Sequence, residues 1–376
     1  MIAHDTTDFV FTGEGRRGLG RMRGTKERGF FAHTALAVSV TRWREPLGVL
    51  NLETWIRPEA KANASKLSPR KRQQIKDRES SRWLRGVEAV EEQLESGHAI
   101  HVMDREADMY DLFTAMVEKK QRFVIRSSFD RRIDGDKKIA EHLTSKPTVI
   151  TREVALSKRQ RSPLPKQREI HPPRNARIAT LGLKAQVVNL LKPRDLPATF
   201  PKSLTLHVVV AEEIDPPAGE PPIYWRLYTA EPIDTVADIE TVVDAYRCRW
   251  RIEELFKALK TGCAIEKRQL ETGHALMNAV ALFTPIAWRV LRHRTLAHAD
   301  ADRPAKRVMS ALQIRILRKQ TKKKLPRALT VAEALVAVAA LGGHLKRNGP
   351  PGWITLSRGY ERLLTLEEGA ILATKM

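Results

Sequence analysis

The alternation of apolar and polar positions predicts a sheet at the start of the chain. Residues 29–56 form two runs rich in Val, Leu, Phe and Thr, separated by a turn around Glu45 and Pro46, and this pattern is typical of β-strands. With the opening segment, these runs predict an antiparallel meander of three strands. The spacing then predicts a helix over 79–94, a strand over 99–104, a helix over 107–118 and a strand over 122–128. Strands followed by alternating strands and helices predict a mixed α/β fold.

The middle of the chain has a different character. Prolines cluster at 163–173, 193–201 and 216–222 with alternating apolar segments between them, so we expect a β-rich insertion over 130–232. From residue 235 the spacing is helical, with helices predicted to about 262 and over 271–297, 304–318 and 330–341. The basic run 318–327 is predicted to be a solvated linker, with phosphate contact as the alternative. We therefore expect a core domain formed by 1–129 and 233–300, the insertion, and a C-terminal helical region over 301–376.

The charge balance indicates a polyanionic partner. The 376 residues include 66 Lys and Arg against 44 Asp and Glu, a net charge of +22. Nucleic acid binding draws much of its free energy from counterion release at phosphates, so an excess of this size favours a nucleic-acid-binding protein. Basic tails, ribosome binding and anionic membranes would give the same bulk figure.

Other features narrow the class further. No apolar run reaches the ~18 to 20 residues that a membrane span requires, and the first residues carry no export signal, so we expect a cytoplasmic protein with no membrane partner. Cys248 and Cys263 are too few for a disulfide framework and have no partners at zinc-ligand spacing. Gly13, Gly15 and Gly18 match a dinucleotide-binding pattern, but arginines surround them and a strand is predicted next, so we reject that interpretation.

The predicted helix from 235 to 262 carries a row of functional side chains. Tyr246, Arg249, Glu253 and Lys260 stand at offsets of 0, 3, 7 and 14, which at ~100° per residue places them within about 60° of one another. Lys257 joins this polar side. Apolar residues repeat on the opposite side at Cys248, Ile252, Leu255 and Leu259. The alternative is a solvated face on which Arg249–Glu253 and Glu253–Lys257 form ordinary ion pairs worth about 0.3 kcal/mol each.

Two further carboxylates stand at positions suited to chemistry. The strand predicted over 99–104 ends at Asp104, and ligands in open α/β sheets bind beyond such strand ends; a helix N-cap is the alternative role. Asp5 lies inside the first predicted strand, where a carboxylate has poor β propensity. Asp108, on the following helix, is predicted to be a surface or capping group.

Two strand carboxylates and one helix carboxylate supply the oxygen ligands of a pair of Mg²⁺ ions about 4 Å apart, with Mn²⁺ as a substitute. Such a pair activates a water or a 3′ hydroxyl and stabilises the leaving oxygen of a phosphodiester displacement. We therefore predict that Asp5, Asp104 and Glu253 are catalytic residues and metal ligands.

The segment YRCRWRIEELFKALKTG resembles the signature of the bacterial DDE transposases of the insertion-sequence-four group, which includes the transposon-five transposase. Tyr246, Arg249, Glu253 and Lys260 match its spacing without a gap. DTT at the start, DREAD with the following RFVIRS, and LGGHLKRNGPPGWITLSRGYERL near the end are also similar, in the same order. The likeness runs from about residue 4 to residue 365.

The resemblance implies a ribonuclease-H-like mixed sheet core with a β-rich insertion, and a C-terminal helical region used for homodimerisation on DNA. It implies a nucleoid-associated cut-and-paste transposase that cleaves double-stranded DNA at transposon ends through a hairpin intermediate and joins the ends to target DNA.

The resemblance also assigns DNA-binding residues by matched position. Tyr246, Arg249 and Lys260 would contact phosphates near the cleaved end, with Lys257 as a further candidate. Trp225 falls where the group stacks a flipped base, and a core aromatic is its alternative role. Arg126 falls where an arginine of the group helps to hold the distorted DNA strand.

The beginning of the chain departs from that group, whose members carry an additional N-terminal domain that recognises transposon ends. Only four residues precede Asp5, so we expect this end-binding domain to be missing. Three functions are therefore compared: a catalytic transposase core, a non-catalytic DNA-binding or dimerising remnant that inhibits a relative, and a ribonuclease-H-like nuclease that cuts without joining ends.

Overall fold

The computed structural model describes residues 1–12, 15–22, 27–41, 43–57, 79–94, 98–156, 158–159, 172–321, 324–345, 347 and 349–374. The chain divides into two compact units. The first unit comprises Met1–Leu67, Arg85–Gln93 and Cys248–Met376, and the second comprises Ser68–Leu84 and Leu94–Arg247. The four-part organisation expected from the sequence stays a prediction.

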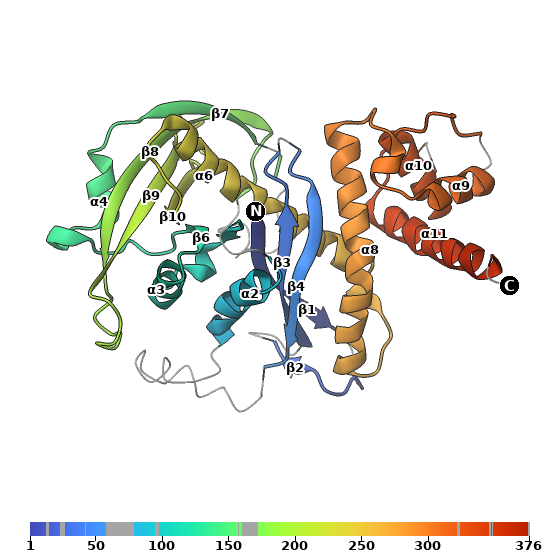
Figure 1. The fold of residues 1–376 in the computed structure, drawn as a ribbon, viewed down its shortest axis with the longest axis horizontal. Helices are drawn as coiled ribbons and strands as arrows, with labels where there is room; N and C mark the ends of the chain where they lie inside the picture. The colour runs from blue at the N-terminus through green and yellow to red at the C-terminus, as the bar shows by residue number, and fades with distance from the viewer. Residues whose placement is uncertain are drawn as a thin grey trace. The chain divides into compact units, whose positions relative to one another are not determined.

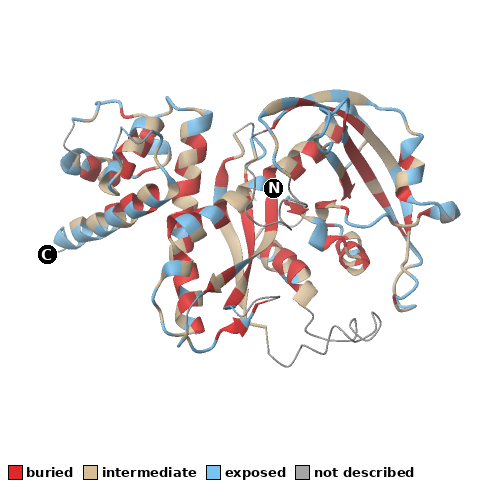
Figure 2. Ribbon diagram, turned by 180° about the vertical axis from the view of Figure 1, so that it is seen from behind, coloured by how far each residue is buried: buried red, intermediate tan, exposed pale blue. Residues whose placement is uncertain are grey.

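The first unit contains the predicted antiparallel meander (Figure 1). Its strands are β1 (Ile2–Phe11), β2 (Gly20–Arg21), β3 (Arg28–Val38) and β4 (Pro46–Trp55). β3 is central, with β1 antiparallel on one side, β4 antiparallel on the other, and β2 paired to its first residues. In this register Asp5 lies opposite Thr34. Figure 2 shows buried positions running along β1, as expected for a strand that contributes to the core.

Helices complete the first unit around two apolar clusters. The helices are α2 (Arg82–Glu91, in this unit from Arg85), α7 (Trp250–Lys257), α8 (Gly273–Ala299), α9 (Ala311–Gln320), α10 (Val331–Leu341) and α11 (Trp353–Ala373), with short 3₁₀ turns at Ile265–Lys267 and Ala305–Arg307. One cluster joins α7 and α8 to the strands through residues such as Phe30 and Ile252. The other joins α9, α10 and α11 to α8 through residues such as Leu317 and Tyr360. Figure 1 shows α8 standing between the strands of this unit and helices α9 to α11.

The sequence predicted no segment that is long and apolar enough to cross a membrane, and α8 contradicts this prediction. By length and composition alone it meets that criterion, and 39% of the window that qualifies is buried. Leu276, Val280 and Leu291 of α8 are at most 1% exposed within the apolar cluster around the strands. A core helix meets the same criterion, and α8 packs as one.

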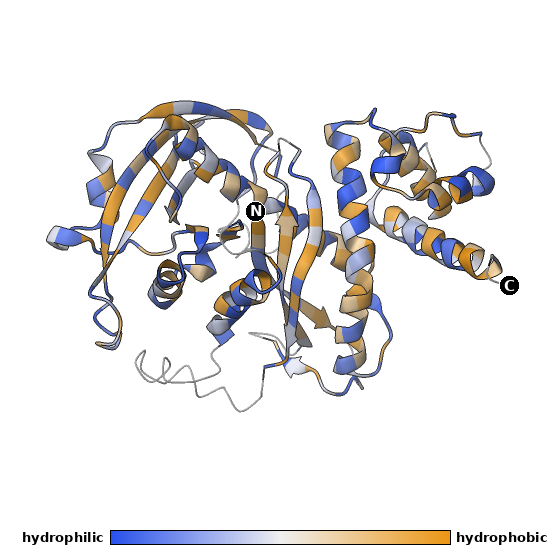
Figure 3. Cartoon of the chain, in the orientation of Figure 1, coloured by the Kyte–Doolittle hydropathy of each residue, from blue (hydrophilic) through white to orange (hydrophobic). Residues whose placement is uncertain are grey.

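The second unit is built on a sheet of mixed direction. Its strands are β5 (Ile100–Met103), β6 (Arg122–Arg126), β7 (Ile150–Leu156), β8 (Arg177–Leu191), β9 (Ser203–Glu213) and β10 (Tyr224–Thr229), in the order β5-β6-β10-β9-β8-β7. β5 and β6 are parallel and the other pairs are antiparallel, so the mixed α/β class is confirmed. β7 to β10 are the strands expected for the insertion, and Figure 3 shows hydrophobic and hydrophilic positions alternating along β8 and β9.

The helical segments of the second unit are α3 (Tyr110–Glu118), α4 (Ile139–Thr144) and α6 (Val236–Cys248, in this unit to Arg247), with 3₁₀ turns at Glu79–Ser81, Arg105–Ala107 and Asp134–Asp136.

The long helix predicted from 235 to 262 is divided into three segments, which corrects the sequence expectation. α6 ends at Cys248, α7 begins at Trp250, and Ala258–Gly262 form a π-helical turn. Arg249 keeps helical dihedral angles, yet its carbonyl accepts from the Ile252 N–H at 3.0 Å, three residues ahead instead of four. The π turn adds one residue to the helical repeat, so the regular spacing that placed Lys260 in the predicted row does not hold at this position.

Candidate active site

Two of the predicted carboxylates face one guanidinium in the first unit. Arg249 Nη1 donates to Asp5 Oδ2 at 2.8 Å, and Arg249 Nη2 donates to Glu253 Oε1. Asp5 Oδ1 accepts from the Thr6 backbone N–H at 2.8 Å. The side chains of Asp5 and Arg249 are 15% and 14% exposed, whereas that of Glu253 is 34% exposed. Asp5 and Glu253, which are far apart in the sequence, therefore meet at a single cation.

The local sequence explains how α7 presents this group. Its apolar side is buried as predicted, and Cys248, Ile252, Leu255 and Leu259 are at most 2% exposed. Arg249 and Glu253 lie one turn apart on another side of the helix. Their pair is the one expected of a solvated face, but Arg249 is largely buried and bonded to β1, so that alternative does not describe it. Lys257 is exposed, and no Glu253–Lys257 pair occurs among the described residues.

Lys260 connects the π turn to β1. Its Nζ lies 2.9 Å from Asp8 Oδ1, 3.9 Å from Glu266 Oε1 and 5.6 Å from the centroid of the Phe9 ring. Glu266 Oε1 also accepts from the Val10 N–H at 3.0 Å. The sequence pattern does not distinguish Asp8 or Glu266, because only the folded chain brings these acids beside Lys260.

In the second unit, Asp104 directly follows β5, at the strand end where the sequence placed it. Its Oδ1 accepts from the Glu106 N–H at 2.9 Å and caps the 3₁₀ turn Arg105–Ala107. The capping role that we kept as the alternative is therefore present, although on this short turn and not on α3.

Three predicted DNA-binding residues meet in the second unit. The Trp225 and Tyr246 rings pack edge to face with centroids 5.5 Å apart. Arg126 Nη1 donates to the Tyr246 hydroxyl at 3.4 Å, and Nη2 donates to the Tyr224 carbonyl at 3.2 Å. Tyr246 is 6% exposed and so is not a solvent-facing residue of α6, whereas Trp225 on β10 is partly exposed, unlike a core aromatic.

Arg105 adds a second guanidinium to this group. Partial desolvation lowers the pKa of Arg105, and the positive charge of Arg126 lowers it further, whereas Tyr246 and Asp104 raise it. Arg105 was not predicted as a site residue, since nothing in its spacing distinguishes it from a surface arginine. Two neighbouring guanidiniums repel each other, and an anion placed beside both would relieve that repulsion.

Asp108 is not the surface group that we expected. Its side chain is fully buried, Oδ2 accepts from the N–H groups of Ser128 at 2.6 Å and Phe129 at 2.9 Å, and Oδ1 accepts from Arg131 Nε at 2.8 Å. This carboxylate fixes the turn after β6, so its role is structural.

The residues of the first unit fit one side of a divalent-cation site. Asp5 and Glu253 offer the carboxylate oxygens that hard cations prefer, and they face a point where the protein already places positive charge. Among the residues that the structure describes, no three His, Cys, Asp or Glu side chains are grouped so that they could hold a metal ion. The third predicted ligand, Asp104, belongs to the second unit.

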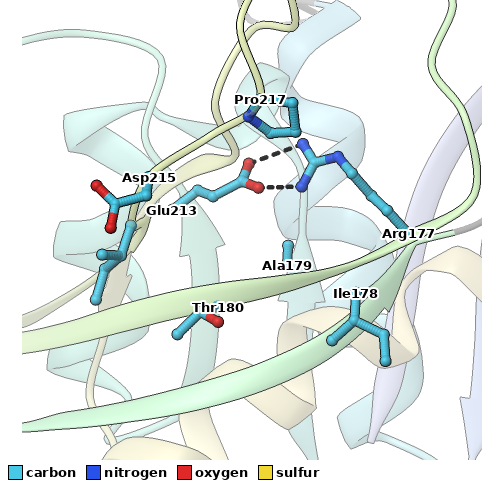
Figure 4. Close-up of a pocket in the computed structure, with 8 residues that line it drawn as sticks. Arg177, Ile178, Ala179, Thr180, Glu213, Asp215 and Pro217 are labelled. Atoms are coloured by element: carbon cyan, nitrogen blue, oxygen red, sulfur yellow. Dashed lines mark hydrogen bonds and ion pairs between the residues drawn. The ribbon is translucent and has the colours of Figure 1, made fainter.

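A cavity of about 320 Å³ in the second unit contains a different charged group (Figure 4). Arg177 on β8 bonds to Glu213 and lies 2.9 Å from Glu220 Oε2. The bond with Arg177 lowers the pKa of Glu213. Because two carboxylates compensate the guanidinium, Arg177 forms a structural ion pair, and none of the predicted site residues lines the cavity.

Comparison with known proteins identifies the family. A solved structure described as a piggyBac transposase synaptic complex with hairpin DNA is similar over 87% of this chain, at 10% identity and a TM-score of 0.36. This chain spans 58% of that one. A family model described as the transposase DDE domain matches residues 60–284, which include Asp104 and Glu253 and begin after Asp5. Because this match covers more than half of its length, the chain belongs to the transposase DDE domain family.

Proposed function

We propose that this protein is a cut-and-paste DNA transposase with a ribonuclease-H-like core, which cleaves double-stranded DNA at transposon ends and joins those ends to target DNA. The observation that carries the proposal is the meeting of Asp5 and Glu253 at Arg249. A strand carboxylate and a helix carboxylate that share a cation are a suitable start for a metal site in phosphoryl transfer. Membership of the family supports a DNA transposase.

Members of this family generally use divalent metal ions. We assign Asp5, Asp104 and Glu253 as the ligands of two Mg²⁺ ions, with Mn²⁺ as a substitute. When bound, such ions activate the attacking oxygen and stabilise the leaving oxygen. The protein's own contribution is to hold the ligands, since the Thr6 N–H and Arg249 fix Asp5 while Arg249 fixes Glu253.

We assign Trp225 and Tyr246 of the second unit to the binding of distorted DNA. Trp225 presents a partly exposed ring whose orientation Tyr246 fixes, and stacking on a flipped base contributes about 1–3 kcal/mol. Arg126 and its neighbour Arg105 supply positive charge for the phosphates of the same strand.

In the first unit, Arg249, Lys257 and Lys260 are assigned to phosphates near the cleaved end. Lys257 is exposed, while Lys260 is held by Asp8 and has to exchange that carboxylate for a phosphate.

The test is metal-dependent cleavage of DNA that carries transposon ends. Asp104→Asn and Glu253→Gln, which keep the side-chain shape and remove the charge, are expected to abolish nicking in Mg²⁺ and in Mn²⁺. Glu254→Gln is the matched control, because Glu254 is the next residue of α7 and pairs with Arg251 instead. Cleavage that persists in both variants, or without metal, would contradict the proposal. Strand transfer from precleaved ends separates a transposase from a general nuclease.

A non-catalytic DNA-binding remnant is the second candidate. It is favoured by the compensation of Asp5 and Glu253 by Arg249 and by the lack of a three-ligand group among the described residues. It predicts salt-sensitive DNA binding without cleavage by the unmodified chain.

We also propose that the chain forms a homodimer on DNA through its C-terminal helical region. Figure 2 shows the last turn of α11 exposed, and Ile371 and Leu372 there are 41% and 56% exposed. Ile371→Asp is expected to shift the DNA complex from dimer to monomer mass in light scattering; an unchanged dimer would contradict the assignment.

A further inference from the structure

The segment from residue 303 to residue 332 concentrates positive charge, with ten Lys or Arg and no Asp or Glu. Two of its arginines have acidic partners elsewhere in the first unit: Arg303 pairs with Asp300 at 2.7 Å and Arg307 pairs with Glu45 at 3.0 Å. Five other basic residues of this segment, on α9 and after it, are exposed. We call them the α9 basic surface, which consists of Arg315, Arg318, Lys319, Lys324 and Arg327, all exposed.

The amphipathic pattern of α9 fixes where these charges point. Ile316 and Leu317 are 8% and 0% exposed and pack into the apolar cluster of the C-terminal helices. At ~100° per residue, Arg315, Arg318 and Lys319 fall within about 100° of one another on the opposite side. The segment predicted as a solvated linker thus begins as the last turn of a firmly anchored helix.

Two residues that follow α9, Pro326 and Arg327, are hydrogen-bonded to the helix. Arg318 Nη2 donates to the carbonyls of Pro326 at 3.2 Å and Arg327 at 2.8 Å. These bonds use backbone oxygens, so they hold Arg327 near the end of α9 without neutralising either guanidinium. The helix and the loop therefore present their charges together.

Nearby carboxylates are committed to helix caps. Glu367 accepts from Ser310 Oγ at 2.9 Å and from Gln313 Nε2 at 2.6 Å, and Glu333 accepts from the Thr330 N–H at 3.0 Å. Within the described part of the chain, no acidic side chain pairs with a member of the α9 basic surface. The positive charge of the α9 basic surface is therefore available to an anionic partner outside the molecule.

We propose that the α9 basic surface binds the phosphate backbone of duplex DNA, as a DNA contact distinct from Arg249, Lys257 and Lys260, the residues of the same unit that are assigned to the cleaved end. That the anion is DNA rests on the proposed function. Figure 1 shows α8 between β1 and α9 in this unit, so the two surfaces engage different parts of a DNA substrate. A lipid surface is disfavoured because the apolar side of α9 is buried and none is left to insert into a membrane.

The test measures the salt dependence of DNA binding by the full chain in the presence of a chelator, with a fluorescent duplex of arbitrary sequence. The variant is Arg315→Glu/Lys319→Glu. A loop variant, Lys324→Glu/Arg327→Glu, gives an independent measurement should the helix variant fold poorly. The matched control is Lys137→Glu/Arg194→Glu, which makes the same charge change at an exposed lysine and arginine of the second unit.

Each lost phosphate contact lowers the slope of log affinity against log salt by about 0.9, so either variant is expected to lower it by about 1.8. At about 0.1 M salt the same relation gives a loss of affinity of about 60-fold for two contacts. The control is expected to keep the slope of the unmodified chain. An unchanged slope in both variants, or an equal fall in the control, would overturn the proposal.

Two further arms separate the possible causes. Weaker binding of the variants to vesicles of anionic lipid, with duplex binding unchanged, would overturn the proposal in favour of a membrane. Metal-dependent cleavage by the unmodified chain is measured in parallel. An inactive chain whose variants still show the lowered slope overturns the proposed function alone, whereas an active chain whose variants keep their slope overturns this inference alone.

Discussion

Replacing Arg249 with glutamine removes the cation that Asp5 and Glu253 share. Asp5 and Glu253, at 15% and 34% side-chain exposure, then lose this shared guanidinium. Breaking a buried ion pair costs about 3–5 kcal/mol, whereas an exposed pair contributes about 0–1 kcal/mol. Because water screens Glu253 more than Asp5, we expect Arg249→Gln to lower the free energy of unfolding by about 2–3 kcal/mol.

Urea denaturation at neutral pH with a chelator measures this loss. For a slope of about 1–3 kcal/mol per molar urea, the unfolding midpoint of the first unit should fall by about 0.7–3 M. Lys257→Gln is the control on the same helix, because Lys257 is exposed and its loss should change stability by at most about 0.5 kcal/mol. Arg249→Lys should fall between the two, since an ammonium cannot present the same fork to two carboxylates.

The stabilisation of the folded protein by added Mn²⁺ is a second test of the same site. A cation that binds only the folded protein raises its stability, and in Arg249→Gln the Arg249 guanidinium no longer competes for Asp5 and Glu253. We therefore expect Mn²⁺ to stabilise this variant more than the unmodified chain. The reasoning is refuted if Arg249→Gln unfolds at the same urea midpoint as Lys257→Gln, or if Mn²⁺ stabilises both proteins equally.

Three further predictions concern other buried or aromatic groups. Burial lowers the pKa of His293, which bonds the Tyr360 hydroxyl at 2.6 Å, to about 4. The folded state therefore resists a proton that the unfolded state accepts near pH 6.5, and about 3 kcal/mol of stability should be lost between pH 6.5 and 4. This pH dependence should be absent from His293→Gln in urea titrations. Asp108→Asn should destabilise the chain by about 3 kcal/mol in urea unfolding, because it leaves Arg131 without its buried partner; a loss below 1 kcal/mol would contradict the structural role. Trp225→Ala should weaken binding to hairpin-ended DNA by about tenfold or more in fluorescence anisotropy and leave an intact duplex nearly unaffected, and equal losses on both would count against base stacking.

The spacing of apolar residues correctly predicted those strands and helices whose buried positions repeat at a regular interval. The meander of β1, β3 and β4, the short strand before Asp104 and the strands of the insertion all lie where alternation predicted them. The buried side of α7 also follows its helical spacing. These features depend on neighbours within a few residues, and the sequence displays those directly.

Interactions between distant segments carried no such pattern. The irregular hydrogen bond at Arg249 and the π turn before Cys263 interrupt a regular helical spacing that the sequence predicts to be continuous. Asp108 looked like a surface group because its partners follow the next strand, beyond the reach of helical periodicity. Arg105 was missed for the same reason, since its proximity to Arg126 exists only after β5 and β6 pair.

The sequence by itself determined the class of the protein and the residues worth examining. Its net charge of +22, the strand before Asp104 and the spacing of Tyr246, Arg249 and Glu253 already indicated a DNA-directed enzyme with carboxylate ligands. Only the tertiary structure decided that Asp5 reaches the carboxylate of α7 through Arg249. The reason is physical: periodicity records which side of an element is buried, whereas the pairing of charges far apart in sequence is set by how the elements pack.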